Sequence, residues 1–151
     1  MGAYIGIDLG TTYSAISMLD ETGRPIIIKN SQKKDSPDGN ITSSCVLFNK
    51  DEAIIGERAR KSFQLNEKAF GRFKRDMGTS VTYDFENKKI KPMELSAVVL
   101  KELKKIAEKE VGEIEKAVIT IPANFTNKAR DETLAAAKKA GLNVDFIIDE
   151  P

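Results

Sequence analysis

The segment with the clearest chemical potential lies near the start of the chain, where residues 5–14 read IGIDLGTTYS. Asp8 ends a predicted buried strand, and the turn after it presents backbone N–H groups together with the hydroxyls of Thr11 and Thr12. Successive backbone donors in such a turn form a concave site for an anion, and Gly10, which has no Cβ, lets phosphate oxygens come close. Asp8 could not lie against bare phosphate, so its useful role is to hold a hard cation, directly or through water. The segment therefore predicts a site for phosphate together with Mg²⁺.

The same turn also allows a plainer interpretation. It lacks the Gly-x-x-x-x-Gly-Lys-Ser/Thr pattern of the Walker phosphate loop, and it joins two predicted antiparallel strands with no helix after it. In an ordinary hairpin of this kind, glycine supplies only a backbone conformation with positive φ. The decapeptide by itself leaves both the phosphate site and the plain hairpin open.

The composition restricts the classes of function and partner. The chain has 151 residues, of which 40% are hydrophobic and 31% charged, and this balance predicts one soluble globular unit. Its 24 basic and 23 acidic residues give no broad positive field, so neither nucleic acid nor a membrane is expected as a partner. No apolar stretch approaches a membrane helix and no secretory leader is recognisable, which favours the cytoplasm. The absence of histidine argues against zinc hydrolysis and Ser-His schemes, and the single Cys45 is expected to fill the core.

The pattern of apolar and turn-forming residues predicts an α/β fold with a mixed sheet. The expected strands cover residues 4–8, 13–19, 25–28, 44–48, 53–55, 117–121 and 144–149. The expected helices are residues 57–63, a segment after Asn66 that runs through Phe70 and Phe73 to Met77, a long amphipathic segment from Pro92, and residues 127–140 capped by Thr126. Residues 31–40 are expected to form a solvated loop, and residues 81–90 alternate between polar and apolar.

Three later segments, taken with the first, carry a resemblance to a known family. Residues 4–14 resemble the first phosphate motif of the actin-like ATPase superfamily, which also includes sugar and acetate kinases. The match narrows to the DnaK, or 70-kilodalton heat-shock, chaperone family through residues 69–78 (AFGRFKRDMG), 117–130 (AVITIPANFTNKAR) and 140–151 (AGLNVDFIIDEP). The resemblance covers essentially the whole chain and is loosest from about residue 30 to residue 68.

The resemblance implies a fold and a place in a larger protein. The fold is a ribonuclease H-like lobe formed by residues 1–42 and 92–151, with residues 43–91 as an inserted, smaller α+β subdomain. The chain would be the truncated first lobe of the ATPase domain, without the second lobe and the peptide-binding domain. In the full protein, ATP binding and hydrolysis with Mg²⁺ would drive cycles of peptide binding and release. Client peptides and co-chaperones would bind through the missing regions, whereas the isolated chain is expected to be nearly inactive and open to self-association.

The resemblance also assigns roles to individual residues. The phosphate-contacting turn corresponds to Gly10, Thr11, Thr12 and Tyr13. Asp8 and Glu150 correspond to acidic residues that reach the hydration shell of the Mg²⁺ beside ATP or ADP. Lys74 corresponds to the catalytic lysine, whose compact charge suits it to place the attacking water and to stabilise charge that develops on the γ-phosphoryl oxygens.

Two further positions are implied to relay the state of the nucleotide to the peptide-binding domain. They are Pro122 and Arg130. From the residues alone, Pro122 is equally well explained as a strand terminator and Arg130 as a solvated helix residue. The chain departs from the family pattern at Asn124, at Asp149, at Ser43 and in a shortened stretch at residues 79–90. These departures favour a divergent relative.

Two other classes of function stay open at this point. One is a small-molecule kinase of the same superfamily, acting on a sugar or an acid. The other is a non-catalytic interaction module that kept the fold.

Overall fold

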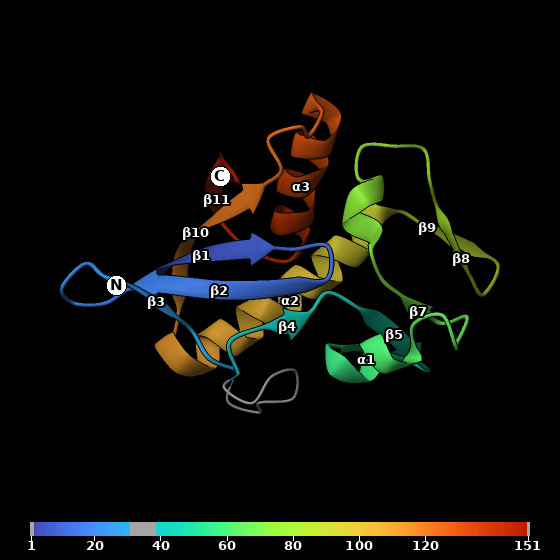
Figure 1. Cartoon of the computed structure of the whole chain (residues 1–151), viewed down its shortest axis with the longest axis horizontal. Helices are drawn as coiled ribbons and strands as arrows, with labels where there is room; N and C mark the ends of the chain where they lie inside the picture. The colour runs from blue at the N-terminus through green and yellow to red at the C-terminus, as the bar shows by residue number, and fades with distance from the viewer. Residues whose placement is uncertain (1, 31–38, 151) are drawn as a thin grey trace.

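We describe residues 2–30 and 39–150 from a computed structural model (Figure 1). Most of the loop predicted at residues 31–40 lies outside these described ranges. The strands are β1 (Ala3–Leu9), β2 (Tyr13–Leu19), β3 (Pro25–Ile27), β4 (Thr42–Ser43), β5 (Val46–Asn49), β6 (Glu52–Ile55), β7 (Ala69–Phe70), β8 (Tyr83–Phe85), β9 (Lys88–Ile90), β10 (Ile114–Ile121) and β11 (Val144–Asp149). The helices are α1 (Glu57–Ser62), α2 (Pro92–Val111), α3 (Asn127–Lys139) and the short 3₁₀ helix η1 (Phe73–Asp76).

The largest sheet in the described part of the chain has six strands. Its order is β11-β10-β1-β2-β3, and β4 pairs with β2 beside this path. β1, β2 and β3 form an antiparallel meander, whereas β10 runs parallel to β1 and β11 runs parallel to β10. The α/β fold with a mixed sheet is therefore confirmed.

The core lies between this sheet and the long helix α2, which runs behind β1 and β2 in Figure 1. Strand residues Ile5, Ile7 and Leu9 alternate onto one face, and all three are buried. They share one core cluster with Leu95 and Leu103 of α2. The predicted apolar stripe of α2 thus packs against the sheet as expected from its helical spacing.

One predicted helix is wrong. The segment after Asn66 begins as a turn, because the Asn66 Oδ1 accepts the N–H of Lys68 at 2.9 Å. Strand β7 follows and pairs with β5, where Phe70 lies opposite Val46. Arg72 then adopts a left-handed conformation with φ of 58°, and only the short helix η1 remains of the predicted helix. Pairing with a distant strand has overridden the local helical pattern.

The residues between β4 and α2 form smaller elements beside the main sheet. β6, β5 and β7 make an antiparallel sheet with α1 next to it, and β8 and β9 form a hairpin. The hairpin turns at Glu86 and Asn87, which both have positive φ, as a type I′ hairpin turn requires. β4, at Thr42–Ser43, still belongs to the main sheet. The division into residues 1–42 plus 92–151 and an insertion at 43–91 stays a prediction.

Candidate functional site

The turn between β1 and β2 is tightly packed at Gly10 and is fixed by hydrogen bonds to Ser44. A Cβ built on Gly10 would lie 1.9 Å from the carbonyl oxygen of Tyr13, so no larger residue fits there. The far side of the turn is fixed by Ser44, whose N–H donates to the Thr12 carbonyl at 2.8 Å. The hydroxyls of Ser44 and Ser14 are also hydrogen-bonded, at 2.8 Å. The glycine is therefore needed for the shape of the turn itself, in addition to any approach by a phosphate.

Asp8 and Glu150 lie at the same edge of the main sheet. Asp8 is near the carboxyl end of β1, opposite Thr120 of β10, whose hydroxyl donates to the Asp8 carboxylate at 3.1 Å. Glu150 directly follows β11, and its N–H donates to the carbonyl of Ile121 at 2.7 Å. Since β1, β10 and β11 are parallel, their carboxyl ends meet where open α/β sheets place ligand groups.

Lys74 reaches this edge from η1, which Figure 1 shows in light green beside α3. Its side chain is only 7% exposed, and its Nζ donates to the Glu150 Oε1 at 2.8 Å. The same Nζ lies 5.9 Å from the centre of the Phe125 ring, which adds a favourable contact between the cation and the aromatic face. Burying an ammonium group costs free energy unless the group is paired. The contacts with Glu150 and Phe125 therefore explain how the fold accommodates the buried charge of Lys74.

A cavity of about 350 Å³ connects this lysine with the β1–β2 turn. Its lining includes Thr11 from the turn, Lys74 from η1, and Pro122 and Phe125 from the segment between β10 and α3. Thr11 and Lys74, which are far apart in the sequence, therefore face one hollow. Because Glu150 is hydrogen-bonded to Lys74, the structure brings the phosphate-contacting turn, the lysine and Glu150 together, and Asp8 lies at the same sheet edge.

Arg130 lies outside this lining. It stands on α3 and donates to the Asp149 Oδ1 at 2.6 Å, beside Glu150. Asp149, noted above only as a departure from the family pattern, thus has a partner in the fold. Thr120 and Phe125 also contact the site residues, but nothing in their local sequence distinguishes them from ordinary strand and core residues.

The residues at this edge suit a magnesium ion that keeps most of its water. Asp8, Glu150 and the hydroxyl of Thr11 offer oxygen atoms, which are the ligands that Mg²⁺ prefers. Within residues 2–30 and 39–150 no group of three or more histidines, cysteines or acids could enclose a metal ion. Mg²⁺ usually keeps several of its water ligands and is held by one or two carboxylates together with phosphate groups. Asp8 and Glu150 therefore fit Mg²⁺ bound with a polyphosphate.

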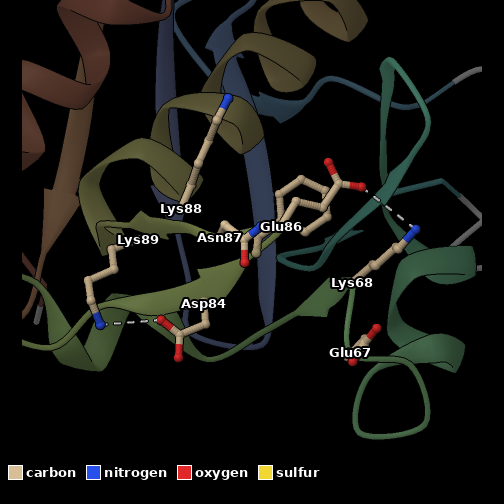
Figure 2. Close-up of a pocket in the computed structure, with 8 residues that line it drawn as sticks. Glu67, Lys68, Asp84, Glu86, Asn87, Lys88 and Lys89 are labelled. Atoms are coloured by element: carbon tan, nitrogen blue, oxygen red, sulfur yellow. Dashed lines mark hydrogen bonds and ion pairs between the residues drawn. The ribbon is translucent and has the colours of Figure 1, made fainter.

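A larger hollow of about 520 Å³ lies elsewhere, over the β8–β9 hairpin (Figure 2). Charged side chains surround it, and two ion pairs join Lys68 to Glu86 and Lys89 to Asp84. It shares no lining residue with the cavity at Lys74. Its lining carries as many acidic as basic side chains, so it offers no clear preference for a charged ligand.

The mixed sheet, its appended small sheets and the turn beside Asp8 define a first lobe of the actin-like ATPase class. Comparison with known sequences narrows this class: the sequence model described as "Hsp70 protein" matches residues 4–151. The chain belongs to the Hsp70 protein family.

Curated relatives agree with this assignment. The chain is 45% identical over 148 residues to the chaperone protein DnaK of Mycoplasmopsis agalactiae, 44% to that of Metamycoplasma hominis and 43% to that of Mycoplasma mobile. Each alignment covers 97% of this chain but only 24% of the relative, so the chain spans about a quarter of the length of these proteins. None of the helices in the described ranges has the length and apolarity to cross a membrane. The cytoplasmic location stays a prediction.

Proposed function

We propose that this chain supplies one wall of the Mg-ATP site of a DnaK-type chaperone. The observation that carries the proposal is the meeting of the β1–β2 turn, Lys74 and Glu150 at one sheet edge, from three segments distant in the sequence. In the full protein, ATP hydrolysis would drive cycles of binding and release of client peptides, with co-chaperones acting through regions beyond this chain. The small-molecule kinase and the non-catalytic module have no structural observation in their favour.

Each residue has a distinct task in this proposal. The turn at Gly10, Thr11, Thr12 and Tyr13 would hold the phosphates with backbone N–H groups and hydroxyls. Asp8 and Glu150 would hold the water shell of Mg²⁺, and the ion would neutralise phosphate charge. Lys74 would orient the attacking water and stabilise charge on the γ-phosphoryl oxygens.

The ion pair with Glu150 serves this task by fixing the lysine in advance. A lysine side chain has many rotamers, and ordering it at the moment of reaction would add to the barrier. In the structure, Lys74 is already buried and held at 2.8 Å from Glu150. We infer that Pro122, which lines the same cavity, and Arg130, through Asp149, sense changes in this arrangement and relay them to other domains.

The proposal is tested in a full-length Hsp70 protein in which this chain replaces the matching region of the Mycoplasmopsis agalactiae DnaK. Lys74→Ala should retain ATP binding but lower the rate of single-turnover hydrolysis by roughly 10²- to 10³-fold, the usual effect of removing one group that stabilises transition-state charge. The control is Lys109→Ala, which changes an exposed lysine of α2. Unchanged hydrolysis in Lys74→Ala would remove the lysine from its role. Failure of the unaltered chimera to bind Mg-ATP would contradict the whole proposal.

A further inference from the structure

Glu132, a residue of α3 outside the site described above, contacts the chain directly after the lysine-bearing helix η1. The N–H of Gly78 donates to the Glu132 Oε2 at 2.6 Å, in a partly buried position. η1 ends at Asp76 and Gly78 follows two residues later, so this hydrogen bond lies where the chain leaves the lysine. A short bond to a carboxylate is among the stronger hydrogen bonds in proteins.

The packing around Gly78 confirms that the chain lies directly on α3 at this point. Gly78 has a φ of +77°, and a Cβ built on it would lie 2.7 Å from the backbone nitrogen of Ala129. Ala129 is in the first turn of α3, where its N–H donates to the capping hydroxyl of Thr126 at 3.1 Å. The backbone after η1 is therefore pressed onto the start of α3, and Glu132 provides the polar bond at this contact.

The start of α3 thus acts on Lys74 in two ways. Phe125, just before the helix, lies 5.9 Å from the Lys74 Nζ, and Glu132 holds the backbone that follows the lysine. Glu150 holds the Nζ itself. The side chain of Lys74 can keep its place only if the backbone that carries it also keeps its place.

We propose that Glu132 is a positioning residue for Lys74: its bond to Gly78 fixes η1 against α3 and so keeps the lysine ammonium at Glu150. The importance of this placement for catalysis rests on the proposed function, whereas the role of Glu132 in holding η1 and Lys74 in place does not. Without the carboxylate, the Gly78 N–H loses its acceptor, and the end of η1 loses its polar bond to α3, while the buried Phe73 still anchors η1 in the core. Glutamine would preserve the bond, because its amide oxygen also accepts an N–H.

The test uses the 151-residue chain without nucleotide and compares Glu132→Ala, Glu132→Gln and the matched control Asp131→Ala, which removes the neighbouring, exposed acid of the same helix. The first readout is hydrogen exchange at the Gly78 amide. We expect exchange about 100-fold slower than in an unstructured peptide in the unaltered chain, at least about 10-fold faster in Glu132→Ala, and nearly unchanged in Glu132→Gln and Asp131→Ala.

The second readout is the ¹⁵N resonance of the Lys74 Nζ, identified by its loss in Lys74→Arg. Glu132→Ala should shift or broaden this signal, whereas Glu132→Gln should restore it. A general loss of stability alone would not produce this selective change. An unprotected Gly78 amide in the unaltered chain, or an unchanged Lys74 signal in Glu132→Ala, would overturn the inference. If Glu132→Ala does not fold, a folded Glu132→Gln chain that has lost Gly78 protection would do the same.

These measurements separate the two proposals. If the Glu132 variants leave Gly78 and Lys74 unaffected, ATP hydrolysis by the full-length protein can still depend on Lys74. Conversely, a chimera that does not hydrolyse ATP would leave the contact between Glu132 and Gly78 intact.

Discussion

At the scale of single residues, the pair formed by Lys74 and Glu150 is asymmetric. The Lys74 side chain is 7% exposed and that of Glu150 is 37% exposed, so the lysine depends far more on its partner than the glutamate does. Removal of the glutamate leaves a buried charge without compensation. Removal of the lysine leaves a carboxylate that water can still reach.

We therefore expect Glu150→Ala to destabilise the chain more than Lys74→Met. The first change should cost about 1–3 kcal/mol, the range for a buried polar group that loses its partner. The second should cost less than about 1 kcal/mol, because methionine fills the same space beside Phe125 without a charge. Urea unfolding of both variants measures the difference. As a control, Lys116→Met breaks a pair whose side chains are each 43% exposed, and it should destabilise the chain much less than Glu150→Ala does. Equal costs for Lys74→Met and Glu150→Ala would contradict the asymmetry.

Tyr83 gives a second prediction at this scale, because its hydroxyl donates to the carboxylate of Asp76, the last residue of η1. Burial, and then the hydrogen bond and charge of Asp76, raise the pKa of Tyr83 well above its usual range. A raised pKa in the folded state means that the stabilisation is complete below the unfolded pKa of about 10 and is lost as the pH rises beyond it.

The unaltered chain should accordingly lose more stability than Tyr83→Phe as the pH rises above about 10. Below that pH, Tyr83→Phe should be less stable by about 1 kcal/mol, the usual net value of one hydrogen bond. Urea unfolding of both chains at pH 8 and pH 10.5 provides the measurement, and the 295 nm difference titration isolates ionisation of Tyr83. Parallel pH profiles for the two chains would show that Tyr83 does not titrate as argued.

At the scale of elements, the β1–β2 hairpin depends on Gly10 for a steric reason that is separate from φ. Gly23 offers a matched comparison, since it has a positive φ of 82° but no atom within 4 Å of a Cβ built on it. Gly23→Ala should cost about 1 kcal/mol through backbone strain alone. Gly10→Ala should cost more than about 2 kcal/mol, because the new methyl group would collide with the Tyr13 carbonyl and the turn would have to open. Thermal unfolding of both variants compares them, and a smaller loss for Gly10→Ala would contradict the steric argument.

The elements also show what local sequence can predict. Strong periodic patterns and caps mark α2, α3 and the strands β1, β2, β3, β10 and β11, which lie within a few residues of where the sequence predicts them. The short strand β4 of the same sheet is not predicted. The segment from Asn66 to Asp76 has a helical pattern too, but its structure is decided by the pairing of β7 with β5, which no local signal reveals. Tertiary pairing of this kind outweighs differences in propensity of well under about 1 kcal/mol per residue.

The candidate site shows the same limit. The turn at Gly10–Tyr13 could be recognised because the residues that would bind phosphate are adjacent in the sequence. The bond between Lys74 and Glu150 joins positions 76 residues apart, and the contacts of Glu132 with Gly78 and of Arg130 with Asp149 link α3 to two different segments. Such contacts exist only after the sheet has placed its parallel strands side by side, so they had to come from the structure.

At the scale of the whole molecule, the proposed function makes this site one wall of a larger nucleotide-binding cleft. Asp8 is exposed, and the cavity that joins Thr11 to Lys74 is open to solvent rather than enclosed by a second set of phosphate donors. Positioning and exclusion of water supply most of the catalysis in phosphoryl transfer, and a single wall supplies little of either. The chain also spans only about a quarter of the length of its curated relatives.

We expect the isolated chain to bind Mg-ATP with a dissociation constant weaker than about 1 mM, which corresponds to a binding free energy of about −4 kcal/mol. Isothermal titration calorimetry measures this value, with Thr11→Val as the control for contact with the turn and Mg²⁺ alone as the control for the ion. The same titration on the full-length chimera should show much tighter binding, because the second wall then orders the nucleotide against the first. A micromolar dissociation constant for the isolated chain would mean that these residues form a complete site, and the one-wall proposal would then be wrong.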